Sequence, residues 1–365
     1  MAITRMTFES VLGHTLPPRE RTAVPAAPRH RALPLSVVVV AAVTVLTGCS
    51  GTAASSPATA TTAGTRTIVS ESGTAEIPVE PERIVALDEP SALNLLSIGI
   101  TPDVVFDSWR TAAPRAVLEA EGIEIASTTS FYPELEEVAA HEPDLIVGTA
   151  AEGFTAGPDY ASIAPLVGGL YNEADGQQII TAYGEYFDRA DEAARVSDVL
   201  DTLAQRAADE QDGDGTSLSV VMSYAQENMP LHMDGANSLH GTIADAGFAR
   251  PALQDEVPAD GSAFGGWTVF SPEKLAEQNA DVLAVAVAAQ YNREGITDMP
   301  LYPSLTAVED GRSLAVDGDL WSGGAAFSTY WVLRDLVSIA SGQDEPGVVG
   351  DDGQRWNDFA TAIGG

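Results

Sequence analysis

Aromatic side chains follow several of the predicted strands, and they are the residues best suited to a chemical role in this sequence. They stand in loops of both halves of the chain, often beside glycine or polar residues. Together with Arg110, which follows Trp109, the set comprises eight residues: Trp109, Arg110, Tyr132, Phe154, Tyr224, Trp267, Tyr291 and Trp321. Aromatic faces with few charges recognise a sizeable organic ligand by stacking and hydrogen bonding. We therefore predict a noncovalent binding site formed by these eight residues.

The usual signatures of catalysis are missing from the sequence. It contains no G-x-S-x-G elbow and no H-E-x-x-H pair, and no phosphate-loop glycines precede Lys274, the only lysine. Asp212 and Asp214 begin like a calcium loop, but the glutamate that should close such a loop is absent. We therefore expect no enzyme activity and no cofactor.

A metal site is an alternative reading of the few histidines. His232 and His240 flank a loop that contains Asp234, so a two-histidine, one-carboxylate site for zinc or manganese is conceivable. Closed metal sites usually draw their ligands from separate elements, which this single loop does not provide. We expect no metal site, and a metal-ion cargo stays open as an alternative.

The charge of the chain limits its partners. Its formal net charge is −35. Such a surface repels nucleic acid phosphates and anionic lipid headgroups, and it attracts cationic patches on a partner. We therefore expect no nucleic acid partner.

The elements that must position these side chains alternate between strand and helix. Short apolar runs at 83–88, 103–107, 124–127 and 144–149 are separated by amphipathic helical stretches, and the pattern resumes at 218. Strands separated by helices of about ten residues are typical of βαβ units and parallel sheets. The halves also share a segment in which a glutamate precedes a strand-opening aspartate by eight residues: Glu136 to Asp144, and Glu273 to Asp281. We predict an α/β fold with two Rossmann-like lobes and mostly parallel sheets.

One stretch, 174–211, predicts a single long helix between the lobes. Its apolar residues recur at helical spacing, Asp175 is a plausible N-cap, and glycines follow Gln211. A helix of this length would measure roughly 50 Å and would act as a rigid brace. The predicted boundaries are 66–173 for the N-terminal lobe, 174–211 for the helix and 212–365 for the C-terminal lobe.

The start of the chain resembles a bacterial lipoprotein signal. A basic segment precedes the apolar run 33–46, which is too short to span a membrane, and Leu46-Thr47-Gly48-Cys49 resembles a lipobox. We predict a signal peptide over 1–48, lipidation of Cys49 and a flexible tether over 49–65. The protein would then be extracytoplasmic, held on the outer face of the cell membrane by the lipid at Cys49 alone. A secretory signal with an incidental cysteine is the alternative.

Four segments together resemble a known family. RIVALDEPSALNLLSIGITPDVV, LEEVAAHEPDLIVG, SPEKLAEQNADVLAV and DGRSLAVDGDLWSGGAAFSTYWVLRDL are similar to the iron–siderophore and cobalamin substrate-binding proteins of bacterial ABC importers. The resemblance implies a class III binding-protein fold, a monomer, and delivery of a ferric siderophore to a permease and, through it, to the ATPase. It also implies that Glu136 and Glu273, one on each lobe, dock into arginine pockets of the permease.

The resemblance further implies a ligand class. Trp267 and Trp321 match ligand-facing positions of hydroxamate-siderophore binders, and Phe154 falls where such proteins carry a tyrosine. The arginine that often precedes their first docking helix is absent here, and Arg110 could replace it from the preceding loop. A strongly anionic catecholate complex would need more cationic side chains, so we expect a ferric hydroxamate. Haem, cobalamin and a bare metal ion remain alternatives.

Overall fold

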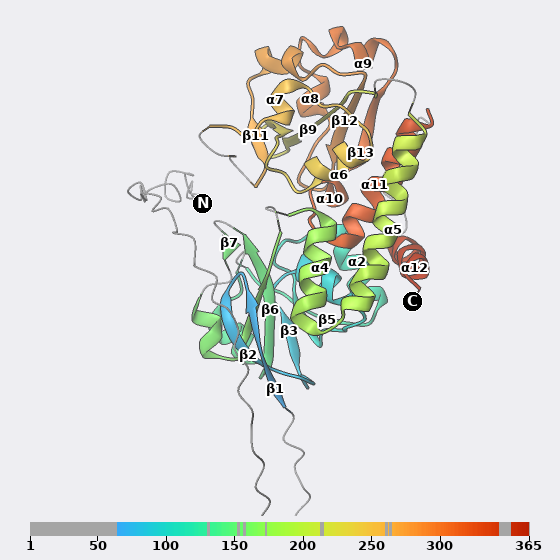
Figure 1. Cartoon of the computed structure of the whole chain (residues 1–365). Helices are drawn as coiled ribbons and strands as arrows, with labels where there is room; N and C mark the ends of the chain where they lie inside the picture. Colours follow the sequence, from blue (N-terminus) through green and yellow to red (C-terminus); the bar gives the residue numbers. More distant parts are fainter. Residues whose placement is uncertain are drawn as a thin grey trace, which may run out of the picture. The chain divides into compact units, whose positions relative to one another are not determined.

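The computed structural model describes residues 64–129, 132–151, 154–155, 158–171, 174–211, 215–259, 262, 265–342 and 352–364. The predicted signal peptide, Cys49 and most of the tether lie outside the described residues. Within the unit Thr61–Gly365, two sheets with covering helices form two lobes (Figure 1). The prediction of an α/β fold with two lobes is confirmed.

The first lobe contains a sheet whose five main strands are all parallel. They are β3 (Ile84–Ala86), β4 (Val104–Phe106), β5 (Glu124–Ala126), β6 (Leu145–Ala151) and β8 (Leu166–Gly169), in the order β5-β4-β3-β6-β8. The connecting helices are α1 (Glu89–Ser97), α2 (Ala112–Ala120) and α3 (Leu135–Ala139). Strands β3 and β4 are buried along their whole length, as expected for a parallel sheet covered on both faces. Short β7 (Phe154–Thr155) pairs antiparallel with β6, and β1 (Thr65–Ser70) and β2 (Gly73–Pro78) form an antiparallel hairpin.

The second lobe has a mixed sheet in the order β11-β10-β9-β12-β13. Strands β9 (Leu218–Tyr224), β12 (Val282–Val287) and β13 (Ser313–Asp317) are parallel, whereas β10 (Met229–Met233) and β11 (Trp267–Val269) add an antiparallel edge. Its helices include α6 (Leu239–Asp245), α7 (Ala252–Asp255), the 3₁₀ helix η3 (Pro272–Gln278), α8 (Glu294–Thr297), η4 (Tyr302–Ser304), α9 (Thr306–Glu309), α10 (Gly318–Trp321) and α11 (Ala326–Ala340). The sequence did not predict β10 and β11.

The segment between the lobes contains two helices, so the prediction of one continuous helix over 174–211 is wrong. Helix α4 (Gly176–Phe187) ends at Asp188, whose φ of 54° is left-handed, and α5 (Ala190–Asp209) follows. Gly184 makes the turn possible, because a Cβ there would lie 2.6 Å from the Cβ of Ala193. Apolar residues continue at helical spacing through the break, since both helices bury a face, and this continuity concealed the turn.

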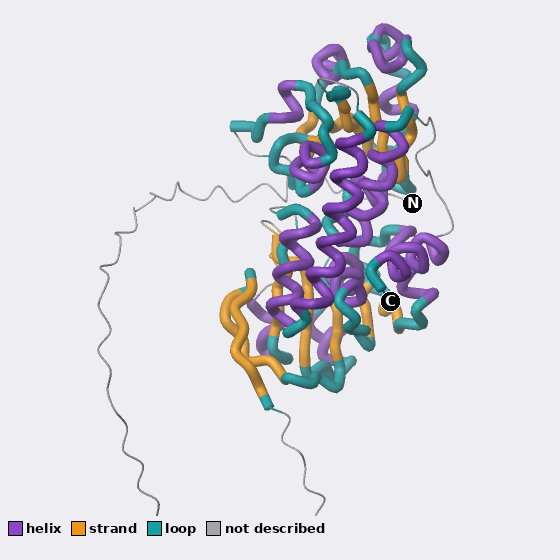
Figure 2. The backbone as a smooth tube through the Cα atoms, turned by 45° about the vertical axis from the view of Figure 1, so that its right-hand side comes forward, coloured by secondary structure: helices purple, strands orange, loops and turns teal. Residues whose placement is uncertain are grey.

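Helix α5 is the element that connects the lobes. At 20 residues it is about 30 Å long. It packs against α4 and also against α6 and α11 of the second lobe, and it runs past both sheets in two views (Figures 1 and 2). No helix among the described residues is long and apolar enough to span a membrane.

The last helix, α12 (Asp352–Ala362), crosses back toward the first lobe. It packs against α2 as well as α11. Its Arg355 forms a buried ion pair with Asp317, at 2.6 Å, where β13 ends. Helix α12 thus contacts elements on both sides, and the predicted lobe boundaries of 66–173 and 212–365 stay a prediction.

One large hydrophobic cluster extends through both lobes, and each lobe also has a smaller cluster of its own. One cluster of buried residues includes strand residues of both sheets together with α1, α4, α5 and α11. Two smaller clusters lie apart from it, one with Val138 of α3 and one with Leu275 of η3. Each of these two residues stands two positions after a predicted docking glutamate, so the duplicated segments take equivalent places in the two lobes.

Candidate functional site: a cavity between the lobes

A cavity of about 460 Å³ lies between the lobes and takes residues from both. Loops after β4 and β8 contribute from the first lobe, and loops after β9 and β12 contribute from the second, together with β11 and the stretch between α10 and α11. Carboxyl ends of parallel strands are the usual place for ligand sites in α/β sheets. The volume is within the range of small-molecule sites, about 300–1,000 Å³.

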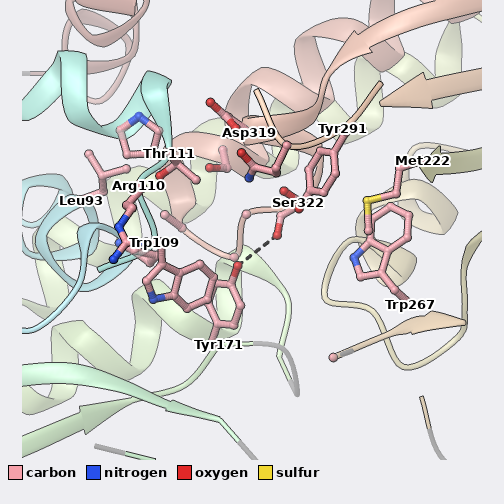
Figure 3. Close-up of a pocket in the computed structure, with 18 of the residues that line it drawn as sticks. Leu93, Trp109, Arg110, Thr111, Tyr171, Met222, Trp267, Tyr291, Asp319 and Ser322 are labelled. Carbon is pink, nitrogen blue, oxygen red and sulfur yellow. Dashed lines mark hydrogen bonds between the residues drawn. The ribbon is translucent and has the colours of Figure 1, made fainter. Parts of the chain in front are cut away.

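Trp109 and Tyr171 form the aromatic part of the first-lobe wall. Their rings meet edge to face with centroids 4.6 Å apart. The Tyr171 hydroxyl donates a hydrogen bond to the carbonyl oxygen of Ser322 in the second lobe, at 3.0 Å (Figure 3). This bond ties the two lobes together at the edge of the cavity.

The loop that carries Trp109 and Arg110 is held by a buried carboxylate. Glu89, at the start of α1, accepts hydrogen bonds from the backbone N–H groups of Trp109 (3.0 Å) and Thr111 (3.4 Å). Arg110 has a φ of 55°, an unusual conformation for a residue other than glycine, and its guanidinium donates to the carbonyl oxygen of Thr128. Burial raises the pKa of Glu89 to about 7.

A second carboxylate reaches the same segment from the other lobe. Asp319 of α10 accepts hydrogen bonds from the backbone N–H groups of Ala112 (2.9 Å) and Ala113 (3.4 Å), at the N-terminus of α2. Burial raises its pKa, while these two bonds partly offset the rise. The free backbone donors of a helix N-terminus favour a carboxylate, so Asp319 acts as a cap supplied across the lobe boundary.

The second-lobe wall is built from strand residues and from two tyrosine rings that pack edge to face. Tyr224 and Tyr291 meet with ring centroids 5.1 Å apart, and Trp267 of β11 lies beside Met222 (Figure 3). Gly266, with a φ of 87°, sets the approach to Trp267, since a Cβ there would lie 2.3 Å from the Cα of Asn237. Burial raises the pKa of Tyr224, so its hydroxyl is neutral at ordinary pH.

Five of the eight predicted ligand residues line the cavity. They are Trp109, Arg110, Tyr224, Trp267 and Tyr291. Tyr132 is half-buried and is not among the lining residues. Phe154 pairs with Ala151 as part of β7, but its side chain lies outside what the structure describes, so its role stays a prediction.

Trp321 does not line the cavity, and its prediction as a ligand residue is wrong. Its side chain is fully buried, and its indole N–H donates to Asp335 of α11 at 2.8 Å. The neighbouring Gly324 leaves room for the ring of Tyr171, because a Cβ at Gly324 would lie 2.7 Å from that ring. The glycines therefore mark a close approach by Tyr171, which sequence reasoning missed.

Several other lining residues were also missed. Tyr171 follows a strand, as the predicted aromatics do, so its position could have revealed it. Asp319, Met222, Gln226 and Gln290 carry no comparable signal in the sequence. Arg110 and Asp319 are the charged residues among the described lining residues, and the Oδ2 atom of Asp319 already accepts from the two N–H groups of α2.

The two histidines considered as metal ligands, His232 and His240, each contact a different group. The Nδ1 atom of His232 faces the carbonyl oxygen of Met233 at 3.3 Å, and the Nε2 atom of His240 lies 3.6 Å from Asp255. Within the described ranges, no three histidine, cysteine, aspartate or glutamate side chains gather as a metal site.

Glu136 and Glu273 are both exposed, one on each lobe. Glu136 lies in the first turn of α3 and Glu273 in the first turn of η3. A backbone N–H and the Ser271 hydroxyl lower the pKa of Glu273. Both carboxylates are thus available to a partner, and docking stays a prediction.

Comparisons with known proteins give consistent results. A family model described as periplasmic binding protein matches residues 84–320. The probable siderophore-binding lipoprotein YfiY of Bacillus subtilis is 28% identical over 316 residues, which cover 82% of this chain and 95% of that protein. The iron(3+)-hydroxamate-binding protein FhuD of Escherichia coli is 26% identical over 275 residues, covering 73% and 89%. The crystal structure of Staphylococcus aureus SirA complexed with staphyloferrin B matches with a TM-score of 0.63 at 20% identity, covering 75% and 98%, which supports the fold.

Proposed function

Since this chain belongs to the periplasmic binding protein family, we propose that it captures a ferric siderophore in the cavity between its lobes and delivers it to an ABC permease. The observation that carries the proposal is an aromatic cavity with a single cationic residue, Arg110, among its described lining. The relatives named for siderophore and iron–hydroxamate binding support the same class of ligand.

We propose that the siderophore is of the hydroxamate type. Such a complex is neutral or cationic, so aromatic faces can hold it without many charged partners. The amides of Gln226 and Gln290 and the hydroxyls of Tyr224 and Tyr291 supply hydrogen-bonding groups around it. A catecholate complex is strongly anionic. Among the described lining residues only Arg110 could balance its charge, and the carboxylate of Asp319 in the same lining would repel it.

Delivery requires the two exposed glutamates. We propose that Glu136 and Glu273 enter arginine pockets of the permease, which passes the cargo on with the energy of its ATPase. Their equivalent positions, each two residues before a fully buried residue of an outer-face cluster, support a matched pair of contacts. Because α5 and one continuous core join the lobes, the change in lobe angle on binding should be small.

The setting follows from the N-terminal sequence. We propose that the protein is extracytoplasmic, that a lipid on Cys49 is its only membrane attachment, and that it acts as a monomer. It would need no cofactor, bind no nucleic acid and catalyse no reaction. A binding-protein family, together with a sequence that lacks catalytic signatures, supports this view.

Tryptophan fluorescence tests the proposal directly. The purified protein is titrated with ferrioxamine B, a ferric catecholate, haem, cobalamin and zinc. Saturable sub-micromolar quenching by ferrioxamine B is expected, weakened at least tenfold in Trp109→Ala, whose ring lies in the cavity wall. Trp331→Phe, on α11 and outside the cavity lining, is the matched control and should bind normally. A response to haem, cobalamin or zinc alone would contradict the proposed cargo.

A further inference from the structure

A second, smaller cavity lies in the second lobe, on the side of η3. It has a volume of about 160 Å³ and shares no lining residue with the ligand cavity. Its walls are largely apolar, formed by Leu253, Val269 and Phe270. Sites for drug-sized ligands need about 300 Å³ or more, so this cavity suits a group the size of one side chain.

Two exposed apolar residues, Leu253 and Val269, line this cavity, and a third, Val257, stands between two lining residues in the sequence. Val257 is 59% exposed, Val269 44% and Leu253 37%. They are three of the five large hydrophobic side chains that the described residues leave exposed, and the other two, Val69 and Val79, lie at the hairpin of the first lobe. Scattered exposed apolar residues need no explanation, but a group around a cavity marks a surface for a partner. We call these three residues the Val269 patch.

The interior of the small cavity offers both a donor and an acceptor. Gln278 is fully buried; its Oε1 accepts from Gln254 at 2.7 Å, and its Nε2 has no partner within the described part of the chain. Gln254 is itself fixed by Arg250, which donates to its Oε1 at 2.5 Å. The ring of His232 also lines the cavity, and burial lowers its pKa, so it is neutral and one ring nitrogen accepts. A hydroxyl group, which both donates and accepts, matches this pair.

Carboxylates border the Val269 patch. Asp255, Glu256, Glu273 and Glu277 are all exposed on α7, η3 and the residue that follows α7. Lys274 lines the cavity as the sole lysine of the chain. The excess of negative charge around an apolar centre favours a partner whose apolar residue is flanked by arginine or lysine.

We propose that the Val269 patch is a docking surface for the permease, which inserts one tyrosine side chain, flanked by basic residues, into the small cavity. The phenol ring would lie against Val269 and Phe270, and its hydroxyl would bond Gln278 and His232. A buried tyrosine within a charged rim is the usual composition of an interface hot spot. This inference rests on the proposed transport function, and it adds a contact next to Glu273 that differs in chemistry from a glutamate–arginine pair.

Uptake of radioactive iron as ferrioxamine B tests the surface in cells of the source organism whose own copy is replaced by variants. Leu253→Asp and Val269→Asp are expected to bind ferrioxamine B normally in the fluorescence titration and to lower uptake by about tenfold or more, as loss of a hot-spot contact does. Val79→Asp makes the same change at an exposed valine beside the first-lobe hairpin and should alter neither property. Glu273→Ala reports on the proposed function separately.

The site of contact is tested by a photocrosslinking residue, p-benzoylphenylalanine, placed at Val257 at the edge of the patch. With an epitope-tagged permease, we expect a crosslink whose peptide contains a tyrosine beside arginine or lysine. A crosslinked peptide without an aromatic residue, or normal uptake by both aspartate variants when Glu273→Ala is defective, overturns the docking surface and leaves the transport function standing. Failure to bind any ferric hydroxamate, together with normal uptake by Glu273→Ala, overturns the proposed function and this inference with it.

Discussion

The two walls of the ligand cavity are held in different ways. On the first-lobe side, backbone N–H groups of residues 109–113 donate hydrogen bonds to two buried carboxylates. Glu89 belongs to the same lobe, and Asp319 belongs to the other. On the second-lobe side, Trp267 belongs to strand β11 and pairs with Met233, and Tyr224 is the last residue of β9. The first wall therefore depends on ionisable groups, whereas the second depends on strand pairing and packing.

Because of this difference, we expect only the first-lobe wall to respond to a change of pH. Burial raises the pKa of both Glu89 and Asp319, so their charge changes nearer to neutral pH than that of an ordinary carboxyl. The second wall presents the hydroxyl of Tyr224, whose pKa burial raises, and the indole of Trp267, which does not ionise. A change of pH should alter the position of Trp109 and leave that of Trp267 unchanged.

The largest contrast should come from truncating the two tryptophans. Trp267 is 4% exposed and Trp109 is partly exposed. Trp267→Ala should lower the free energy of unfolding by about 3–5 kcal/mol, because a cavity remains in the core. Trp109→Ala should lower it by about 1 kcal/mol or less and act on ligand affinity instead. Urea denaturation of both variants measures the difference, and equal losses of stability would show that the walls are not built differently.

The next effect concerns pH and Glu89. The pKa of Glu89 in the folded protein is about 7, above its unfolded value of 4.5, so folding is favoured when Glu89 is protonated. Its contribution is complete below pH 4.5 and is lost as pH rises through 7. The shift corresponds to about 3 kcal/mol.

Glu89→Gln should therefore flatten the fall of unfolding free energy between pH 4.5 and 7. Denaturation at a series of pH values measures this slope. Glu119→Gln, an exposed glutamate on α2 whose side chain pairs with Arg115, is the matched control and should keep the wild-type slope. The same slope in wild type and Glu89→Gln would mean that another buried carboxyl, such as Asp88, sets the pH dependence.

The sequence predicted elements better than it predicted contacts. A strand forms at each of the four apolar runs of the first half, and another begins at 218, because local apolar patterns define them. The equivalent positions of Glu136 and Glu273 in the two lobes also follow from a repeat that is local in the sequence. The break at Asp188 was missed because the same apolar spacing serves one helix or two packed ones.

Trp267 and Trp321 show why the site itself was predicted only in part. Each stands beside a pair of glycines, so the two look alike in the sequence. What separates them is distant in the chain, since Asp335 binds the indole of Trp321 and Tyr171 occupies the space that Gly324 leaves. No local pattern carries a contact between residues 171 and 324.

The smallest expected effect concerns the cap that Asp319 places on α2. Asp319→Ala should lower the free energy of unfolding by about 1 kcal/mol, as for other lost helix caps, and should speed hydrogen exchange at the amides of Ala112 and Ala113. Asp175→Ala removes a cap of similar kind, since Asp175 accepts from Gln178 within α4. Its loss of stability should be comparable, but its affinity for ferrioxamine B should not change.

Asp319→Ala should also weaken ferrioxamine B binding. The first-lobe wall then loses the hydrogen bonds that Asp319 of the second lobe accepts from the backbone of Ala112 and Ala113. Titration of both variants separates the two roles. If Asp175→Ala weakens binding as much as Asp319→Ala, general loosening of the fold would explain the effect. If only Asp319→Ala weakens binding, the shape of the cavity depends on the hydrogen bonds between Asp319 of the second lobe and the N-terminus of α2 in the first.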